Sequence, residues 1–402
     1  MEDFMLKTAE FGVLGVITFY LLTKGTAEID KLAESNKRLA EAVDKFFSKV
    51  SNIDIRVSSI EYELRNIGTR LEKILASPHY FNGRFECLTP VQVMSQDEGE
   101  RENRFVATWK FLFGDKTGLV PPKPIPSVKT DLHSLDGDCA LWLGHSSIYL
   151  QLAGRKILLD PVFSSYASPI FFVNRAFDGS NVFSAADFPA IDILAITHDH
   201  WDHLDYPSIM SLKPKIKTVL CPLGVGEYFE QWGFDADKII EDDWDAVIDF
   251  GRGFTAHILP SQHFSGRLLT QNPTEWCAFA FVTPARKIFC SGDGGYGQHF
   301  RDIGRKFGGF DLAFMENGQY NQAWHAIHLL PDETAQASVD VRAKKVVPIH
   351  AGKFALARHE WNAPYKDLLA NSVDKDYELL TPKIGEVINF DVEQNFSAWF
   401  NF

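Results

Sequence analysis

Apolar positions in residues 29–74 recur every three or four residues without a break, as in a helix with one apolar seam. A lone helix would expose this seam, so we expect residues 29–76 to pair with copies of themselves as a left-handed coiled coil. Asn36 lies in the seam and favours a dimer, whereas isoleucine and leucine later in the segment favour more strands, so the number of strands is open. A long helix folded back on the rest of the chain is the alternative. Pro78 ends the helix because proline cannot continue the hydrogen-bond ladder. The apolar seam consists of Ile29, Leu32, Leu39, Val43, Phe46, Val50, Ile53, Val57, Ile60, Leu64, Ile67, Leu71 and Ile74.

A shorter apolar run, residues 11–22, precedes the seam. Extended back to Phe4, it approaches the length that spans a membrane only if Lys7 and Glu10 snorkel or pair. Residues 1–28 are therefore a candidate membrane anchor, and the choice between spanning and interfacial attachment is open. An ordinary helix packed on a partner is the other interpretation. The basic residues after the run predict that the rest of the chain lies on the cytoplasmic face of the membrane.

Residues 78–402 have a different pattern, in which short apolar runs alternate with turns and a few longer amphipathic stretches. This pattern predicts an α/β fold with mixed sheets buried between helices. Helices are expected around residues 224–232, 298–307 and 331–342, and the acidic run at 241–245 is interpreted as a solvated turn. The expected strands are Ala140–Leu143, Ser147–Leu150, Ile157–Leu159, Ile191–Ile196, Thr218–Leu220, Phe254–Leu259, Ala278–Val282 and Lys287–Phe289.

The composition fits one catalytic domain plus an accessory segment. The chain has 402 residues, of which 45% are hydrophobic and 13% aromatic, and this is enough for a large core. The formal net charge of -13 argues against a nucleic-acid partner, which would need a basic surface. The 5 cysteines are odd in number and widely spaced, which predicts reduced thiols in a cytoplasmic setting.

Histidine and aspartate are concentrated directly after the apolar run Ile191–Ile196, at His198, His200, Asp202 and His203. Alternate residues of an extended segment point the same way, so the first two histidines can share one metal ion. Asp202 and His203 can face a second ion. Imidazole and carboxylate ligands suit zinc, with iron and manganese as lesser alternatives. A polar turn that is rich in histidine by chance is disfavoured, because so many titratable groups without partners after a buried strand would be costly.

The motif at 198–203 resembles the HxHxDH signature of the metallo-β-lactamase superfamily. His263, Asp293 and His350 follow in the order expected for that superfamily, each at the exit of an apolar run. The resemblance implies a four-layer αββα fold with two zinc ions per chain. It further implies that the first ion is held by His198, His200 and His263, that the second is held by Asp202, His203 and His350, and that Asp293 bridges the two.

Further runs look like the N-acyl phosphatidylethanolamine-hydrolysing phospholipase D branch of that superfamily, over roughly residues 78 to 390. This resemblance implies that His328 lies beside the metals and contacts the substrate phosphate. The chain has Ala351 where many relatives have tryptophan, so a wider pocket wall is expected there. The runs that carry the resemblance are Trp142–Ser147, Leu158–Phe163, Glu316–Tyr320 and His350–Leu356.

An aromatic loop between Asp160 and the motif contains Phe171 and Phe172. It is either a buried lid or the lining of a channel for acyl chains, and Arg175 in the same loop is a candidate contact for lipid phosphate. His145 and Asp160 are candidates for orienting metal ligands, with turn stabilisation as the alternative.

These features favour a dinuclear zinc hydrolase of the phospholipase D type. It would act on N-acyl phosphatidylethanolamine or related lipids by metal-activated hydroxide attack. Asp293 would anchor the nucleophile and His328 would assist the phosphate or the leaving group. One alternative is a hydrolase of small phosphorylated sugars, lactones or cyclic nucleotides. Another is a membrane-tethered scaffold or effector in which the coiled coil has the main role.

Overall fold

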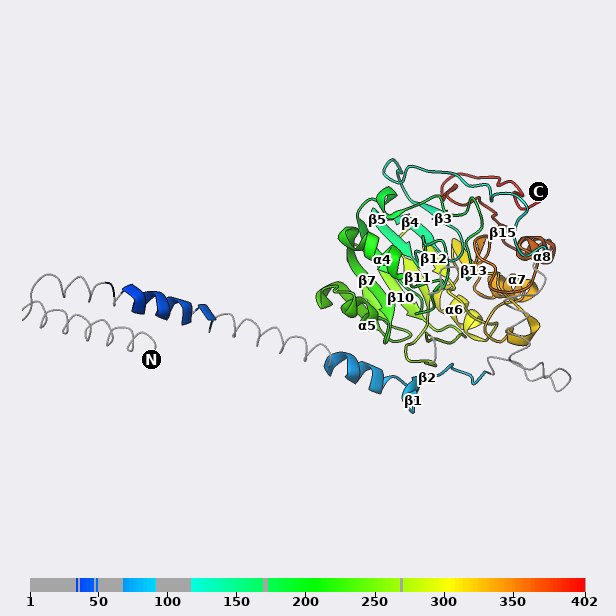
Figure 1. The fold of residues 1–402 in the computed structure, drawn as a ribbon. Helices are drawn as coiled ribbons and strands as arrows, with labels where there is room; N and C mark the ends of the chain where they lie inside the picture. The colour runs from blue at the N-terminus through cyan, green and yellow to red at the C-terminus, as the bar shows by residue number, and fades with distance from the viewer. Residues whose placement is uncertain are drawn as a thin grey trace, which may run out of the picture. The chain divides into compact units, whose positions relative to one another are not determined.

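The chain divides into two compact units, Met1–Thr69 and Arg70–Phe402, and the larger one contains both sheets (Figure 1). The computed structural model describes residues 34, 37–46, 48–49, 68–91, 117–168, 173–267 and 270–401.

In the smaller unit, the described residues between 34 and 49 are helical. The seam residues Leu39 and Val43 are 57% and 42% exposed. Most other seam positions lie outside the described residues, so the coiled coil stays a prediction. The predicted anchor at 1–28 also lies outside them. Within the described part of the chain, no helix has the length and hydropathy needed to cross a membrane.

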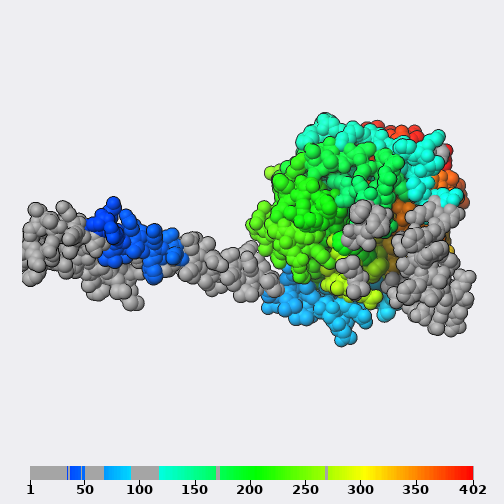
Figure 2. All heavy atoms as spheres, viewed as in Figure 1, coloured from blue at the N-terminus to red at the C-terminus, as the bar shows by residue number. Residues whose placement is uncertain are grey.

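The end of the predicted coiled-coil segment is attached to the catalytic unit. Arg70 forms two hydrogen bonds with Glu230, at 2.9 and 2.6 Å, and an ion pair with Glu241. Ile74, a seam position, packs against the main core. Figure 2 shows this light-blue segment lying against green and yellow-green atoms. The interpretation of residues 241–245 as a solvated turn is wrong in part, because Glu241 lies in a strand and is buried.

Two seven-stranded sheets form the centre of the larger unit, and a short hairpin of β1 (Tyr80–Phe81) and β2 (Arg84–Phe85) precedes them. The first sheet has the order β16-β3-β4-β5-β6-β7-β8, and the second has the order β15-β14-β13-β12-β11-β10-β9. The strands of the first sheet are β3 (Cys139–Trp142), β4 (Ile148–Leu152), β5 (Arg155–Leu159), β6 (Ile191–Ala195), β7 (Ile216–Pro222), β8 (Ile239–Asp242) and β16 (Val387–Asn389). Those of the second are β9 (Val247–Asp249), β10 (Thr255–Leu259), β11 (Ala278–Val282), β12 (Lys287–Cys290), β13 (Leu312–Glu316), β14 (Lys345–Ile349) and β15 (Glu378–Leu379).

Alternating side chains fill separate cores on the two faces of each sheet. In β4, Ile148 and Leu150 belong to the core between the sheets, whereas Tyr149 belongs to the core under the outer helices. In β13, Phe314 faces the central core and Met315 faces the other outer core. Both faces are covered, and this explains why these strands are mostly apolar.

Helices cover the outer faces of both sheets. Figure 1 shows α4 and α5 on one flank and α6, α7 and α8 on the other. The αββα fold predicted from the sequence is thus confirmed, and the helices expected around 224–232, 298–307 and 331–342 are present as α5, α6 and α7. The α-helices are α4 (Tyr206–Leu212), α5 (Gly226–Gln231), α6 (His299–Phe307), α7 (Pro331–Asp340) and α8 (Ala363–Asn371). Short 3-10 helices are η1 (Ala185–Asp187), η2 (Lys213–Lys215), η3 (Ala236–Lys238) and η4 (Gln322–Trp324).

Candidate metal centre

The candidate site lies where strands of both sheets end. In the first sheet β6 leads into the motif at 198–203, and in the second sheet β10, β12 and β14 lead to His263, Asp293 and His350. Neighbouring strands β5 to β7 are parallel, as are β12 to β14, so their carboxyl ends gather at one edge of each sheet. All seven predicted metal ligands fall into groups whose ligand atoms lie within 4.8 Å of one another.

The first predicted triad is compact and buried. The Nδ1 atom of His200 lies 2.9 Å from Nε2 of His198 and 3.2 Å from Nε2 of His263. A nitrogen that carries at most one hydrogen cannot donate to both neighbours. Three nitrogens bound to one tetrahedral zinc, at about 2.0–2.1 Å each, would be about 3.3 Å apart. The three imidazoles therefore fit a shared zinc ion.

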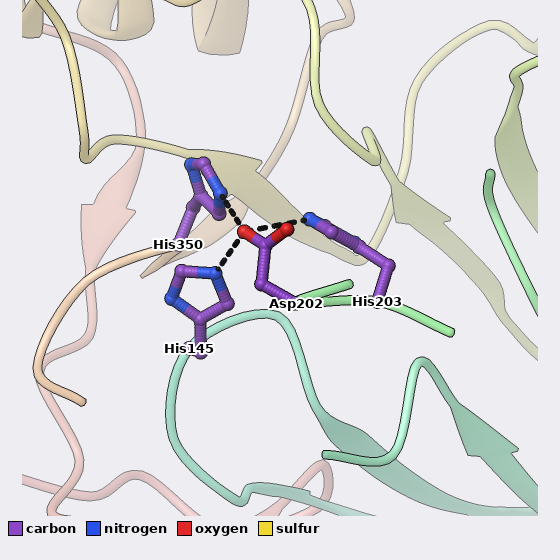
Figure 3. A group of neighbouring side chains, drawn as sticks. All are labelled: His145, Asp202, His203 and His350. Carbon is purple, nitrogen blue, oxygen red and sulfur yellow. Dashed lines mark hydrogen bonds and ion pairs between the residues drawn. The ribbon is translucent and has the colours of Figure 1, made fainter. Parts of the chain in front are cut away.

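The second predicted triad surrounds Asp202 (Figure 3). Its Oδ2 atom lies 3.3 Å from Nε2 of His350 and 3.7 Å from Nε2 of His203. His145 joins this group, since its Nε2 lies 2.8 Å from the same oxygen. The arrangement supplies two nitrogens and a carboxylate oxygen for a second ion.

Asp293 lies between the two triads. Its Oδ2 atom is 3.0 Å from Nε2 of His350, 3.1 Å from Nε2 of His203 and 3.9 Å from Nε2 of His263. Its Oδ1 atom is buried and has no hydrogen-bond partner among the described residues. A dry carboxylate oxygen without a partner is costly, and a bound cation would remove that cost. This geometry fits the bridging position implied by the resemblance.

The protonation of the buried histidines also favours a cation in the site. Burial lowers the pKa of His198 and of His263 well below the usual value, so both rings are neutral, the form that binds a metal. Burial acts in the same direction on His350, but Asp293 and Asp202 outweigh it and raise its pKa to about 10. The carboxylates of the second pocket thus favour a positive charge on this ring, and a divalent ion would supply that charge in place of the proton.

Two further residues, which the sequence offers either for orienting ligands or for stabilising turns, contact predicted ligands. Asp160 accepts a hydrogen bond from the backbone N–H of Thr197 at 2.8 Å, and its Oδ2 lies 2.8 Å from Nδ1 of His203. Burial and the nearby His350 lower the pKa of His145 to about 3, so its ring is neutral and Nε2–H can donate to Asp202. Partners of this kind fix the orientation of a ligand, and the carboxylate of Asp160 also raises the basicity of His203.

Left-handed backbone conformations occur at three of these residues. The φ angles of His145, Asp160 and His350 are 53°, 41° and 63°. Such angles are uncommon for residues other than glycine and cost of order 1–3 kcal/mol each. His145 and His350 stabilise each other, because the N–H of His350 donates to the carbonyl of His145 at 3.0 Å. The fold thus fixes the backbone that presents the ligands.

His328 lies beside both triads. Its ring centroid is 5.0 Å from that of His263 and 5.3 Å from that of His350. Its Nδ1 forms a close hydrogen bond with the carboxylate of Glu316, which is fully buried and also lies 3.2 Å from Nδ1 of His350. Glu316 was not among the predicted site residues. Its place at the end of β13, a strand the sequence reading left unassigned, was the available signal.

The aromatic loop gives a mixed outcome. Phe171 and Phe172 lie outside the described residues, so their predicted role is not tested. Arg175 is largely exposed and forms an ion pair with Asp178 at 3.1 Å. A cavity of about 460 Å³ instead opens beside His263, within the range of about 300–1,000 Å³ that small-molecule sites occupy. Its lining consists of Arg84, Glu86, Cys87, Pro90, Val91, His263, Phe264, Ser265, Gly266, Thr270, Gln271 and Asn272.

Known proteins resemble this chain in both sequence and fold. Residues 155–351 match the model of the β-lactamase superfamily domain. An uncharacterised protein of Mycobacterium tuberculosis is 34% identical over 330 residues, which cover 81% of this chain and 87% of that protein. The N-acyl-phosphatidylethanolamine-hydrolyzing phospholipase D 1 of Caenorhabditis elegans is 32% identical over 292 residues, covering 68% of this chain and 82% of that protein.

A solved isothiocyanate hydrolase from Delia radicum gut bacteria has the same fold, with a TM-score of 0.50 at 18% identity over 63% of this chain and 99% of that one. The conserved architecture and the clustered histidines and carboxylates agree with these relationships. The chain belongs to the metallo-β-lactamase superfamily of metal-dependent hydrolases and is related to its N-acyl phosphatidylethanolamine-hydrolysing phospholipase D branch.

Proposed function

We propose that the protein is a dinuclear zinc phosphodiesterase of the phospholipase D type, acting on N-acyl phosphatidylethanolamine or a related lipid. The observation that carries this proposal is the sharing of Asp293 between two triads, with the His328–Glu316 pair beside both. The name of the Caenorhabditis elegans relative supports the substrate class.

The charge of the site suits an anionic diester. Two divalent ions would outweigh the two carboxylates predicted to bind them directly, Asp202 and Asp293, so the ions with their ligands alone would carry a positive charge. When bound, the ions would supply a Lewis acid for a phosphoryl oxygen and lower the pKa of an attacking water. The seven ligand residues hold the ions, and Asp160 and His145 keep two of those ligands in place.

His328 is the residue proposed to act on the substrate. Glu316 holds the Nδ1 side of its ring, so Nε2 is the atom left to bind a phosphate oxygen or to exchange a proton with the leaving group. The side chain of His328 is 13% exposed, whereas Glu316 has no exposed side-chain surface. The pair thus combines a partly accessible ring with a buried group that orients it.

The remaining parts of the proposal concern the N-terminal unit. Residues 29–76 would join copies of the chain as a dimer or higher oligomer. Residues 1–28 would hold the protein on the cytoplasmic face of a membrane, close to a lipid substrate. Both rest on the sequence pattern of residues that are mostly outside the described part of the chain.

The test combines metal analysis with a substrate comparison. Purified protein should contain about two zinc ions per chain, as its ligand set implies. N-acyl phosphatidylethanolamine in mixed micelles should be cleaved to phosphatidate and N-acylethanolamine faster than bis-p-nitrophenyl phosphate is hydrolysed. Full activity after complete removal of metal would contradict the mechanism. Faster turnover of lactones or cyclic nucleotides than of lipid would contradict the substrate class.

A further inference from the structure

Asp199 is a buried carboxylate in the middle of the motif, between two predicted ligands of the first ion. Its Oδ1 accepts the backbone N–H of Gly266 at 2.8 Å, and its Oδ2 accepts the hydroxyl of Tyr228 at 3.0 Å. Tyr228 belongs to α5, and Gly266 follows His263 in the loop after β10. One side chain thus connects the motif loop to two other parts of the fold.

Arg267 also connects these loops, but it belongs to the loop after β10 and its side chain contacts the motif loop. Its Nε–H donates to the carbonyl of Asp199 at 2.5 Å, and its Nη2 donates to the carbonyl of Leu204. The guanidinium lies over the rings of Trp201 at 4.1 Å and Tyr228 at 5.0 Å. A rigid fork that binds one carbonyl within the motif and one directly after it, and that stacks on aromatic rings, holds that loop in one shape.

We propose that Asp199, Arg267 and Tyr228 form a clamp that positions the first metal pocket. The motif loop carries His198 and His200, and the loop held by Gly266 carries His263. The distance between the ligand nitrogens of these histidines depends on how the two loops sit against each other. The clamp joins those loops without supplying a ligand, so its residues are positioning residues. This inference rests on the metal centre of the proposed function.

The clamp also supports the wall of the cavity. Ser265 and Gly266 line the 460 Å³ space beside His263, and the bond from Gly266 to Asp199 holds that wall in place. The clamp therefore sets both the first pocket and the space that opens next to it. The second pocket has separate supports, Asp160 for His203 and His145 for Asp202.

This separation gives a test in which the two pockets respond to different substitutions. Zinc titration of the full-length apoprotein against a chromophoric chelator resolves two dissociation constants. Asp199→Ala should weaken one of them about 10–100-fold, the range typical for loss of a partner behind a ligand. His145→Ala should weaken the other. With cobalt(II) in place of zinc, Asp199→Ala should change the visible spectrum of the first site while leaving that of the second.

Conservative variants separate positioning from charge. In Asp199→Asn, the amide oxygen can accept from Gly266 and the amide nitrogen can donate to Tyr228, so near-normal affinity is expected. Arg267→Lys cannot form the fork and should behave like Asp199→Ala. If Asp199→Ala does not fold, Tyr228→Phe removes a single hydrogen bond and should weaken the same constant to a smaller degree.

Asp192 provides a matched control. It lies in β6, the strand that leads into the motif, and its carboxylate likewise accepts a backbone N–H, from Lys156 at 2.9 Å, and a side-chain donor, Lys217 at 2.6 Å. Asp192→Ala should leave both zinc constants unchanged. Two results would contradict the clamp and leave the proposed function intact. One is a folded Asp199→Ala variant with the zinc dissociation constants of the wild type. The other is an Asp199→Asn variant that binds zinc as weakly as Asp199→Ala. Failure of the wild type to bind zinc would instead remove the metal centre itself.

Discussion

Asp293 is the residue on which both pockets depend. Its Oδ2 contacts histidines of both triads, and its Oδ1 has no protein partner among the described residues. Asp293→Asn keeps the volume but removes the negative charge that a bridging ligand needs. We expect it to lose bound zinc and all measurable turnover while keeping the fold, as measured by elemental analysis, kinetics and circular dichroism. Two zinc ions at normal affinity in this variant would contradict a bridging role.

His328 and Glu316 should affect turnover without affecting metal content. Loss of a group that transfers a proton in the transition state costs about 10²–10⁴-fold in rate. His328→Ala should lower kcat within this range, and Glu316→Gln, which weakens only the orientation of the ring, should lower it less. Zinc content is the control for both. Unchanged kcat in His328→Ala would exclude this ring from the reaction.

The predicted ligands were visible in the sequence because their spacing is local or because each follows an apolar strand. The structure brings all seven together, with His328 beside them. Glu316 and Asp199 were missed for different reasons. Glu316 ends a strand that was not recognised, and Asp199 sits inside the motif but acts through Tyr228 and Gly266, whose proximity depends on the tertiary fold.

At the scale of elements, Lys353 holds two loops of the site together. Its Nζ donates to the carbonyl of Val162 at 2.5 Å, and its own carbonyl accepts the N–H of Phe177 at 2.7 Å. Burial lowers the pKa of this lysine from 10.5 to about 7. Between these values the unfolded chain carries the extra proton and the folded chain does not, so its contribution to stability rises with pH.

The prediction for Lys353 is therefore a pH-dependent difference from Lys353→Met. The stability of the wild type relative to this variant should increase from about pH 7 to about pH 10 and be constant below pH 7, where both states are protonated. Chemical denaturation of both proteins across this range measures the difference. Parallel curves would show that the lysine keeps its ordinary pKa in the folded protein.

The helices were predicted only in part. The helices α5, α6 and α7 appear where expected, whereas α4 and α8 were missed. Helix α4 has only seven residues, and its start depends on Asp205, whose side chain accepts the N–H of Ser208. Glu241 was placed in a solvated turn because its neighbours are acidic. Its burial depends on Arg70, which is 171 positions earlier in the chain and invisible to a local pattern.

At the scale of the whole molecule, the attachment of Arg70 defines where the N-terminal unit can be removed. Deleting residues 1–67 leaves Arg70 bound to Glu230 and Glu241, so the product should be as stable as the full chain and lower in oligomeric state. Deleting residues 1–76 also lowers the oligomeric state but leaves a buried glutamate unpaired, at a cost of about 3 kcal/mol.

Light scattering and denaturation of both truncations measure these effects. If particles of the full chain and of the truncated chains contain the same number of copies, the seam does not join copies of the chain. Equal stability of the two truncations would show that the contacts of Arg70 contribute little.

Each metal pocket takes ligands from both sheets, so the order of synthesis determines when each pocket has all its ligands. During synthesis the ligands of the first pocket, with the shared Asp293, have all emerged once Asp293 has left the ribosome. The second pocket lacks His350 until β14 has been made, near the end of the chain. A nascent chain can thus complete one metal pocket well before the other. The second ion can bind in its final site only after His350, which follows β14, has been synthesised.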